Sequence, residues 1–326
     1  MASTYKESLV HALNDLLADP KVFLLGEDIA DPYGGAYGIT KGLSTRFPGK
    51  VINTPMSEQG FTGIGVGMAL AGYKPIVEIM FGDFSTLILD QILNHASKFS
   101  EGFETPIHFV ARVPMGGYRG YGATHSQSLE KIFLGLPNIS VITPSVLHEP
   151  GPLLVKSLGL GNPVVFVENK LDYTRKLFSS DSISEDFDIQ YHGDSFPICE
   201  ASFPDEDSDV TIISYGGLVH PLLHMMHDLY MEEEIATRLF DLSSLSAVDF
   251  DLLFQLVKNS ARIITVEEGH IPGGVGDMII SNLAQRGLAC QYQSIGASLH
   301  IIGTSTEAES SVLPQMDDIR NCILNG

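Results

Sequence analysis

Cysteine and basic side chains are scarce in this sequence of 326 residues. The three cysteines, Cys199, Cys290 and Cys322, are too few and too far apart for a disulfide framework or a CxxC metal site, so we interpret them as reduced, structural thiols. Lys and Arg number 19 against 40 Asp and Glu, which gives a formal net charge of -21. A surface this acidic repels phosphate backbones and anionic lipid heads, so we expect neither nucleic acid nor a membrane surface as a direct partner.

Long apolar runs are also absent. No run approaches the roughly 18 residues that a membrane-spanning helix needs, and residues 1–7 lack the apolar core of a signal peptide. The sequence therefore predicts a cytoplasmic protein, or an organelle-matrix protein whose presequence has been removed. It also lacks a Walker-type phosphate loop, an HExxH zinc helix and a GxSxG nucleophile elbow, which argues against three common catalytic classes.

Strand and helix patterns alternate along the first half of the chain. Regularly spaced leucines predict a helix over residues 4–18. Further helices are predicted at residues 57–72 and 84–99, and strands at residues 22–25, 51–54, 75–80, 107–112, 141–142 and 164–167. Residues 174–208 are rich in Ser and Asp without a clean period, and a second strand and helix series begins at Val210. We predict an α/β protein with two doubly wound domains, residues 1–178 and 209–326, joined by a linker at residues 179–208.

Two glycine-containing segments resemble known ligand-binding motifs, but neither matches its motif fully. Gly63, Gly65 and Gly67 suggest a dinucleotide site, but an apolar residue stands where the last glycine of G-x-G-x-x-G belongs. We favour close packing of a helix face formed by Gly63, Gly67 and Ala71. The segment 82–84 (GDF) begins like the Gly-Asp-Gly motif that binds magnesium and diphosphate in thiamine enzymes, but its third glycine is missing. We therefore do not assign it as a metal site.

Three histidines, His220, His224 and His227, have the spacing of one helix face and could ligate a metal. They flank Met225 and Met226, and we identify no acidic fourth ligand for them. We favour an ordinary helix face, and we assign no metal-binding residue to this chain.

Glu58 and His125 lie in segments that resist a purely structural interpretation. Glu58 stands where a predicted strand ends and a helix begins, at the sheet edge where open α/β folds bind ligands. A surface carboxylate that favours the helix dipole is the alternative. The glycine-rich segment 116–128 (GGYRGYGATHSQS) reads as a mobile loop that delivers His125, a side chain suited to proton transfer near neutral pH. From the sequence pattern alone, a functional role and a purely structural role are equally supported for Glu58 and for His125.

These segments, in this order, resemble the β subunit of the thiamine-diphosphate-dependent 2-oxo acid dehydrogenases of the pyruvate and branched-chain type, in the transketolase-like superfamily. The resemblance covers residues 4–173 and 210–323. It rests on residues 22–28 (VFLLGED), 40–43 (TKGL), 54–60 (TPMSEQG), 67–72 (GMALAG), 90–96 (DQILNHA), 125–128 (HSQS), 162–169 (NPVVFVEN), 266–269 (VEEG) and 274–276 (GVG).

The resemblance implies a pyrimidine-binding domain followed by a transketolase C-terminal domain. It also implies an α subunit that holds Mg²⁺ and the diphosphate of thiamine diphosphate, an α2β2 heterotetramer, and a lipoyl acyltransferase component as a further partner. Glu58 falls on the glutamate that hydrogen-bonds a pyrimidine ring nitrogen and thereby activates the cofactor. Met56, Met80 and Phe84 fall on positions that line the pyrimidine, and His125 on the histidine that orients or protonates intermediates during acyl transfer.

The sequence departs from the family in two places. Residues 158–161 (LGLG) replace a segment that usually carries an aspartate near a structural potassium site, and residues 303–311 (GTSTEAESS) replace a proline- and aromatic-containing stretch. Bound potassium, the particular 2-oxo acid and the acyl acceptor are left open. Two alternatives also stand: ketol transfer between sugar phosphates, as in a split transketolase, and a non-catalytic paralogue.

Overall fold

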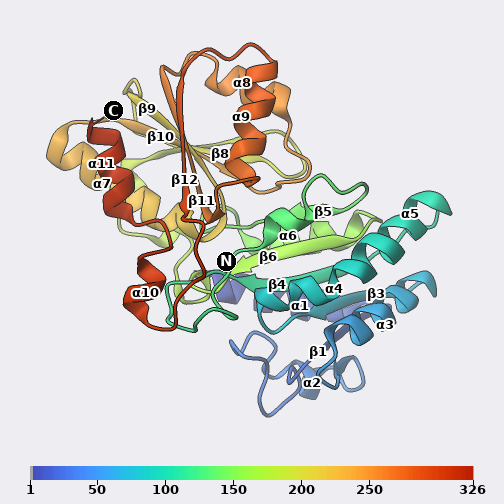
Figure 1. Cartoon of the computed structure of the whole chain (residues 1–326). Helices are drawn as coiled ribbons and strands as arrows, with labels where there is room; N and C mark the ends of the chain where they lie inside the picture. The colour runs from blue at the N-terminus through green and yellow to red at the C-terminus, as the bar shows by residue number, and fades with distance from the viewer. Residues whose placement is uncertain (1–2, 326) are drawn as a thin grey trace.

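The computed structural model describes residues 3–325, which form two α/β domains (Figure 1). The first domain contains a six-stranded sheet in which all strands are parallel. Its strands lie in the order β2 (Val51–Asn53), β1 (Val22–Gly26), β3 (Lys74–Glu78), β4 (Val110–Met115), β6 (Val164–Asn169) and β5 (Ser140–Ile142).

Helices cover both faces of this first sheet. One face packs against α1 (Tyr5–Ala18) and α6 (Pro150–Gly159), and the other against α3 (Glu58–Leu70), α4 (Ser85–Asp90) and a π-helical stretch (Gln91–Ser97) that continues into α5 (Lys98–Gly102). Successive strand residues point to opposite faces, so Val110 joins the α1 side and Ala111 the α3 side. The short α2 (Leu43–Arg46) precedes β2. The predicted doubly wound architecture is confirmed.

The second domain contains a mixed six-stranded sheet. Its order is β12 (Gln291–Ala297), β11 (Arg262–His270), β9 (Val210–Ser214), β10 (Thr237–Leu242), β8 (Ile198–Ser202) and β7 (Asp188–His192). The first four strands are parallel, and β8 and β7 run antiparallel to their neighbours. Helices α7 (Val219–Glu233) and α11 (Met316–Asn325) cover one face, and α8 (Phe250–Val257) and α9 (Val275–Gln285) the other; the short α10 (Thr306–Ser310) lies near the first domain in Figure 1.

The segment 179–208 differs from the linker that the sequence predicts. It contains β7 and β8, which form a hairpin added to the edge of the second sheet beside β10. Only the stretch before β7 connects the domains without a strand. The hairpin escapes a periodicity search because most of β7 is exposed, as the outermost strand of a sheet can be.

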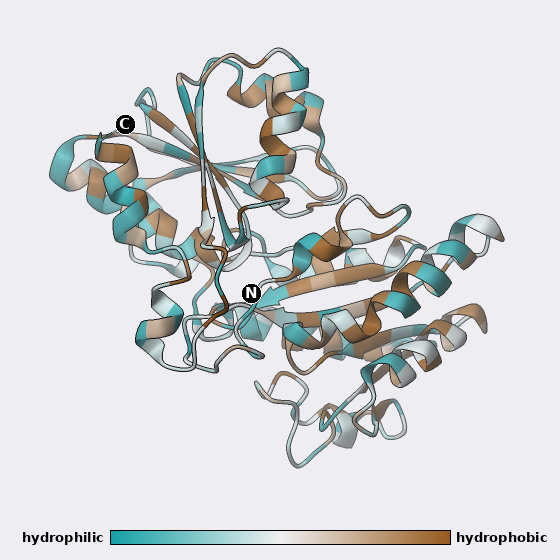
Figure 2. Ribbon diagram, in the orientation of Figure 1, coloured by the Kyte–Doolittle hydropathy of each residue, from teal (hydrophilic) through white to brown (hydrophobic). Residues whose placement is uncertain are grey.

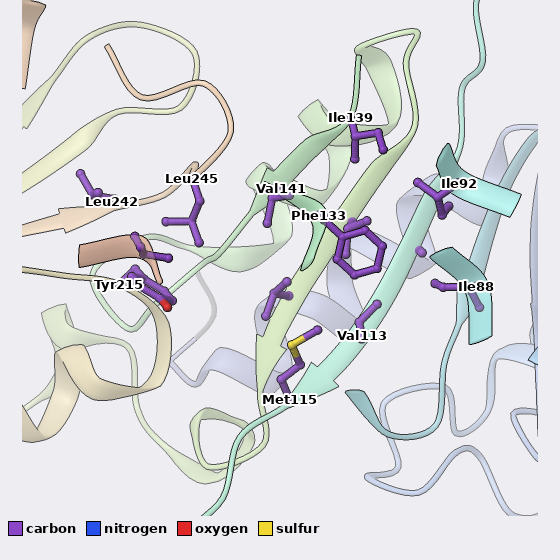
Figure 3. Close-up of a cluster of buried hydrophobic side chains, with 14 of the residues drawn as sticks. Ile88, Ile92, Val113, Met115, Phe133, Ile139, Val141, Tyr215, Leu242 and Leu245 are labelled. Carbon is purple, nitrogen blue, oxygen red and sulfur yellow. The ribbon is translucent and has the colours of Figure 1, made fainter. Parts of the chain in front are cut away.

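A continuous apolar core joins the two domains. Tyr215, Leu242 and Leu245 of the second domain lie opposite Val141 and Met115 of the first (Figure 3). Backbone hydrogen bonds reinforce this contact, since Thr143 N donates to Ser243 O at 2.9 Å and Leu245 N to Val141 O at 2.9 Å. The domains therefore meet through a packed interface. Among the described helices, none has the length and apolarity needed to cross a bilayer.

Helix α3 positions the start of the candidate site. Ser57, where the predicted helix begins, occupies the N-cap position, although the Ser57 side chain makes no capping hydrogen bond. The packing glycine, however, is Gly65 and not the predicted face of Gly63, Gly67 and Ala71. A Cβ at Gly65 would lie 2.9 Å from both Phe109 and Val77, whereas a Cβ at Gly67 would meet nothing within 4 Å. The helix thus rests on the sheet through Gly65.

Candidate active site

The side chains with catalytic potential gather at the carboxyl edge of the first sheet. Glu27 follows β1, Glu58 follows β2, Phe84 follows β3, His125 lies in the loop after β4, and Lys170 follows β6. Figure 2 shows β6 as apolar along its length and hydrophilic at its carboxyl end. Because the strands are parallel, their carboxyl ends share one edge, which is where open α/β sheets bind ligands.

Glu58 is the first residue of α3, and its exposed fraction is 7%. Within residues 3–325 its carboxylate has neither a hydrogen bond nor an ion pair, and its oxygens still reach solvent. The amino terminus of α3 favours the negative charge. Burial and, second, the charge of Glu58 raise the pKa of Glu27, so the two carboxylates lie near each other. The side chain of Glu58 is therefore largely buried, while its carboxylate is open to a hydrogen-bond donor from another molecule.

An aromatic cluster surrounds His125. Its ring centroid lies 4.6 Å from that of Phe81 and 5.4 Å from that of Phe84, in edge-to-face geometry. Phe81 and Phe84 are themselves 6.3 Å apart, and Tyr121 packs on Phe81 at 6.1 Å. The structure thus brings two of the predicted site residues, Phe84 and His125, into contact. Phe81 was not predicted, although it lies one residue before the segment 82–84.

The remaining predicted residues lie around this edge. Met80 is half-buried two residues after β3, whereas Met56 is 79% exposed beside the edge strand β2. Strand β1 separates β2 from β3, so Glu58 and Phe84 follow strands that are not direct neighbours. Met56 therefore presents an apolar side chain to solvent at the rim of the site.

Hydrogen bonds fix the glycine-rich loop that carries His125. Gly117 N donates to Glu268 at 2.5 Å, Gly120 N donates to Glu309 at 2.7 Å, and Tyr118 donates to the carbonyl of Pro314 at 2.7 Å. All three acceptors belong to the second domain. The sequence predicts a mobile loop, but the structure anchors it, and its glycines permit close approach: a Cβ at Gly117 would lie 2.5 Å from Leu313.

Lys170 is a second residue that sequence reasoning missed. It is fully buried, its ammonium group donates to the carbonyl of His125, and it lies 5.6 Å from the centre of the Phe81 ring. Burial lowers the pKa of Lys170 to about 8. Lys170 directly follows the segment 162–169, which is the only signal in the sequence that points to it.

Other charged groups near this edge are already engaged. Asp83 accepts from the Gln127 side chain at 2.7 Å, so it ties the segment after β3 to the His125 loop. Arg112 is fully buried, and it donates to Glu168 at 2.6 and 2.8 Å and to Glu78 at 2.6 Å. These contacts give Arg112 a structural role, whereas Asp83 is engaged through Oδ1 alone and its buried Oδ2 has no partner among the described residues.

Comparison with known proteins agrees with this architecture. The model of the transketolase pyrimidine-binding domain matches residues 2–176, and that of the transketolase C-terminal domain matches residues 200–319. Among solved structures, a split gene transketolase in an inactive beta4 tetramer superposes with a TM-score of 0.74 at 20% identity, covering 99% of this chain and 98% of that one. At this identity the likeness concerns the fold alone.

Curated relatives are more similar in sequence. The mitochondrial pyruvate dehydrogenase E1 component subunit beta-1 of Arabidopsis thaliana is 33% identical over 324 residues, which cover 97% of this chain and 87% of the plant protein. The beta subunit of the acetoin:2,6-dichlorophenolindophenol oxidoreductase of Cupriavidus necator is 32% identical over 286 residues, which cover 83% of this chain and 80% of that protein.

The fold and the matched domains define a transketolase-like chain, in which a pyrimidine-binding domain precedes a transketolase C-terminal domain. Within this class, the chain belongs to the family of the pyruvate dehydrogenase E1 β subunit and related thiamine-diphosphate-dependent dehydrogenase β subunits. The resemblance seen in its motifs is thereby confirmed.

Proposed function

We propose that this chain is the β subunit of a heteromeric dehydrogenase that decarboxylates a 2-oxo acid and passes the acyl group to lipoamide or a similar acceptor. Glu58 carries the proposal, because its side chain is largely buried at a helix start while its carboxylate, without a partner among residues 3–325, is open to an incoming hydrogen-bond donor. The family of the chain supports the same chemistry.

The residues at the carboxyl edge fit the pyrimidine half of thiamine diphosphate. Glu58 would hydrogen-bond a ring nitrogen and hold a proton there, while Phe84, Met80 and Met56 would offer apolar surface to the ring. When bound, this cofactor supplies an electron sink for decarboxylation next to the substrate carbonyl. The ring of His125, which shares a 2.9 Å hydrogen bond through Nδ1 with Thr124, is suited to orient or protonate the bound substrate.

The diphosphate half of the cofactor requires a second chain in this proposal. The segment 82–84 lacks the third glycine of the diphosphate motif, and Asp83 is bonded to Gln127. An α subunit that carries Gly-Asp-Gly with a following asparagine would supply Mg²⁺ and the diphosphate site, and two copies of each subunit would form an α2β2 heterotetramer.

The test is to co-express this chain with such an α subunit and to measure CO₂ release from pyruvate and branched-chain 2-oxo acids. Glu58→Ala should lower the rate by about 10²–10⁴-fold, the range typical of general acid–base groups. Gln59→Ala, at the exposed neighbouring position, is the matched control and should retain activity. The assigned role is wrong if Glu58→Ala assembles normally and keeps its rate within about tenfold of the unaltered enzyme.

Ketol transfer between sugar phosphates is the weaker alternative. A phosphate site needs several free cations, but Arg112 is held by two carboxylates. Lys131 donates to the carbonyls of His270 and Pro272, and Arg119 donates to the carbonyl of Lys170. Assays with ketose phosphates and with acetoin, the substrate named for the Cupriavidus necator relative, separate these reactions from 2-oxo acid decarboxylation. If the assembled complex failed to bind thiamine diphosphate, the chain would instead be a non-catalytic paralogue.

A further inference from the structure

Helix α7 of the second domain carries two histidines one turn apart. His220 and His224 stand at i and i+4, and their ring centroids are 4.6 Å apart. From the sequence alone we favour an ordinary helix face. The structure changes this interpretation, because the segment between the domains brings Asp181 to the two rings.

Asp181 faces both histidines through the same oxygen. Its Oδ2 lies 3.5 Å from Nε2 of His220 and 3.3 Å from Nε2 of His224, and one ligand atom of each residue lies within 4.8 Å of the others. Around a tetrahedral zinc ion with bonds of roughly 2.0–2.1 Å, neighbouring donor atoms are about 3.3 Å apart. The two carboxylate–imidazole distances therefore already match the spacing of donors around one ion.

A backbone hydrogen bond holds the carboxylate of Asp181 in place. Its other oxygen, Oδ1, accepts from the backbone N–H of Ile183 at 3.3 Å, which leaves Oδ2 directed at the histidines. Phe178 and Ile183, on either side of Asp181, are buried in the core that α7 helps to form. Such support of a ligand by backbone contacts is typical of metal sites.

The environment permits an ion to enter from solvent. Asp181 is nearly buried, but His220 and His224 retain side-chain exposures of 25% and 40%. Both histidines line a surface hollow that also contains Asp228 and Asp317. The positive charges nearby are paired elsewhere, since Arg320 lies 2.7 Å from Glu232 and Arg175, beside His220, lies 2.7 Å from Asp172. A fourth coordination position would open toward this hollow.

We propose that Asp181, His220 and His224 form a binding site for a divalent transition-metal ion such as Zn²⁺. Two imidazoles and one carboxylate are a common donor set for zinc, which takes a fourth ligand from water. The ion would join the inter-domain segment to α7 and so stabilise the second domain. This site is independent of the thiamine chemistry, because none of its residues lies at the carboxyl edge of the first sheet.

A matched control lies on the same two elements. His227 of α7 faces Asp186 of the same inter-domain segment at 3.4 Å, but no second histidine joins that pair. If both places were ordinary imidazole–carboxylate contacts, substitutions at His220 and at His227 would have the same effect on Zn²⁺ binding. Metal binding requires the donors of the first site only.

The experiment uses the full chain, stripped of metal with a chelator and free of thiamine diphosphate and Mg²⁺, and titrates it with Zn²⁺ in a calorimeter. We expect one ion per chain and a higher melting temperature. Asp181→Asn and His220→Ala should each weaken binding by about tenfold or more, whereas His227→Ala should bind as the unaltered chain does. Absorption of the Co²⁺ form in the visible range should report nitrogen and oxygen ligation in the unaltered chain and disappear in His220→Ala.

Three outcomes would overturn the proposal: no stoichiometric binding of Zn²⁺, undiminished binding by Asp181→Asn and His220→Ala, or equal weakening by His227→Ala. His224→Gln provides a third ligand variant, again with a polar side chain. Metal-free melting curves of all variants identify any that fail to fold. The ligand variants that do fold then decide the result.

Discussion

Replacing Gly65 by Ala tests how α3, and with it Glu58, is seated on the first sheet. The added Cβ would lie 2.9 Å from a ring carbon of Phe109 and 2.9 Å from a methyl carbon of Val77. Both side chains have exposed fractions of 0%, so neither has free space beside it into which to move. The helix must lift away from the sheet, or the core must deform.

Two opposing effects set the change in the free energy of unfolding caused by Gly65→Ala. Overpacking of a core by one methyl group typically costs about 1–3 kcal/mol, and the upper half of that range applies because two buried side chains are approached at once. Replacing Gly by Ala within a helix stabilises the helix by about 1 kcal/mol. We therefore expect Gly65→Ala to destabilise the chain by about 1–2 kcal/mol.

Gly67→Ala is the matched control on the same helix. Its Cβ would meet nothing within 4 Å, so only the helix-propensity gain of about 1 kcal/mol applies. The two variants should therefore differ by about 2–3 kcal/mol, which thermal or urea unfolding of the isolated chain can resolve. Equal unfolding midpoints for the two variants would refute the packing role of Gly65. In the assembled enzyme, Gly65→Ala should also lower activity, because a shift of α3 displaces Glu58.

Two further predictions concern buried charges. Arg112→Ala leaves Glu78 and Glu168 buried without their common partner, and we expect a loss of about 3–5 kcal/mol of stability; an unchanged urea midpoint would contradict this. Burial raises the pKa of both Glu267 and Glu268 to about 7, above the ordinary value of 4.5, so the folded chain binds more protons than the unfolded chain between these values. Stability should therefore fall as pH rises from about 4.5 to 7. Glu268→Gln should flatten this dependence in melting curves, and Glu101→Gln at an exposed position should not.

The buried elements of the fold were predictable, whereas the edges were not. Strands such as β1 and β9 are largely apolar runs because both of their faces are covered. In contrast, β7 and β12 lie at opposite edges of the second sheet, and Ala297 is the one fully buried residue in the two strands, so they lack that pattern. Helix α6 was missed because Pro and Gly at its start read as loop signals. There Pro150 occupies the first helical position, and Gly151 allows close contact with Ser8 of α1.

The residues of the candidate site also differ in whether the sequence could predict them. Glu58 and His125 lie in motifs whose local sequence marks them, and the family assigns them a role. Phe81 and Lys170 are ordinary in sequence, and only the meeting of β3, β4 and β6 at one edge brings them to His125. Asp181 reaches His220 and His224 only through the packing of the inter-domain segment on α7, which no pattern along the chain specifies.

The second domain has a direct part in arranging the first domain's site. It holds the His125 loop through Glu268, Glu309 and the carbonyl of Pro314, and each bond joins residues far apart in the sequence. Glu309 belongs to the segment 303–311, which departs from the family pattern, yet it is fully buried against this loop. The unusual sequence of that segment therefore does not exclude a structural role at the site. It follows that the position of His125 depends on the docking of both domains, while Glu58 is placed by the first sheet and α3 alone.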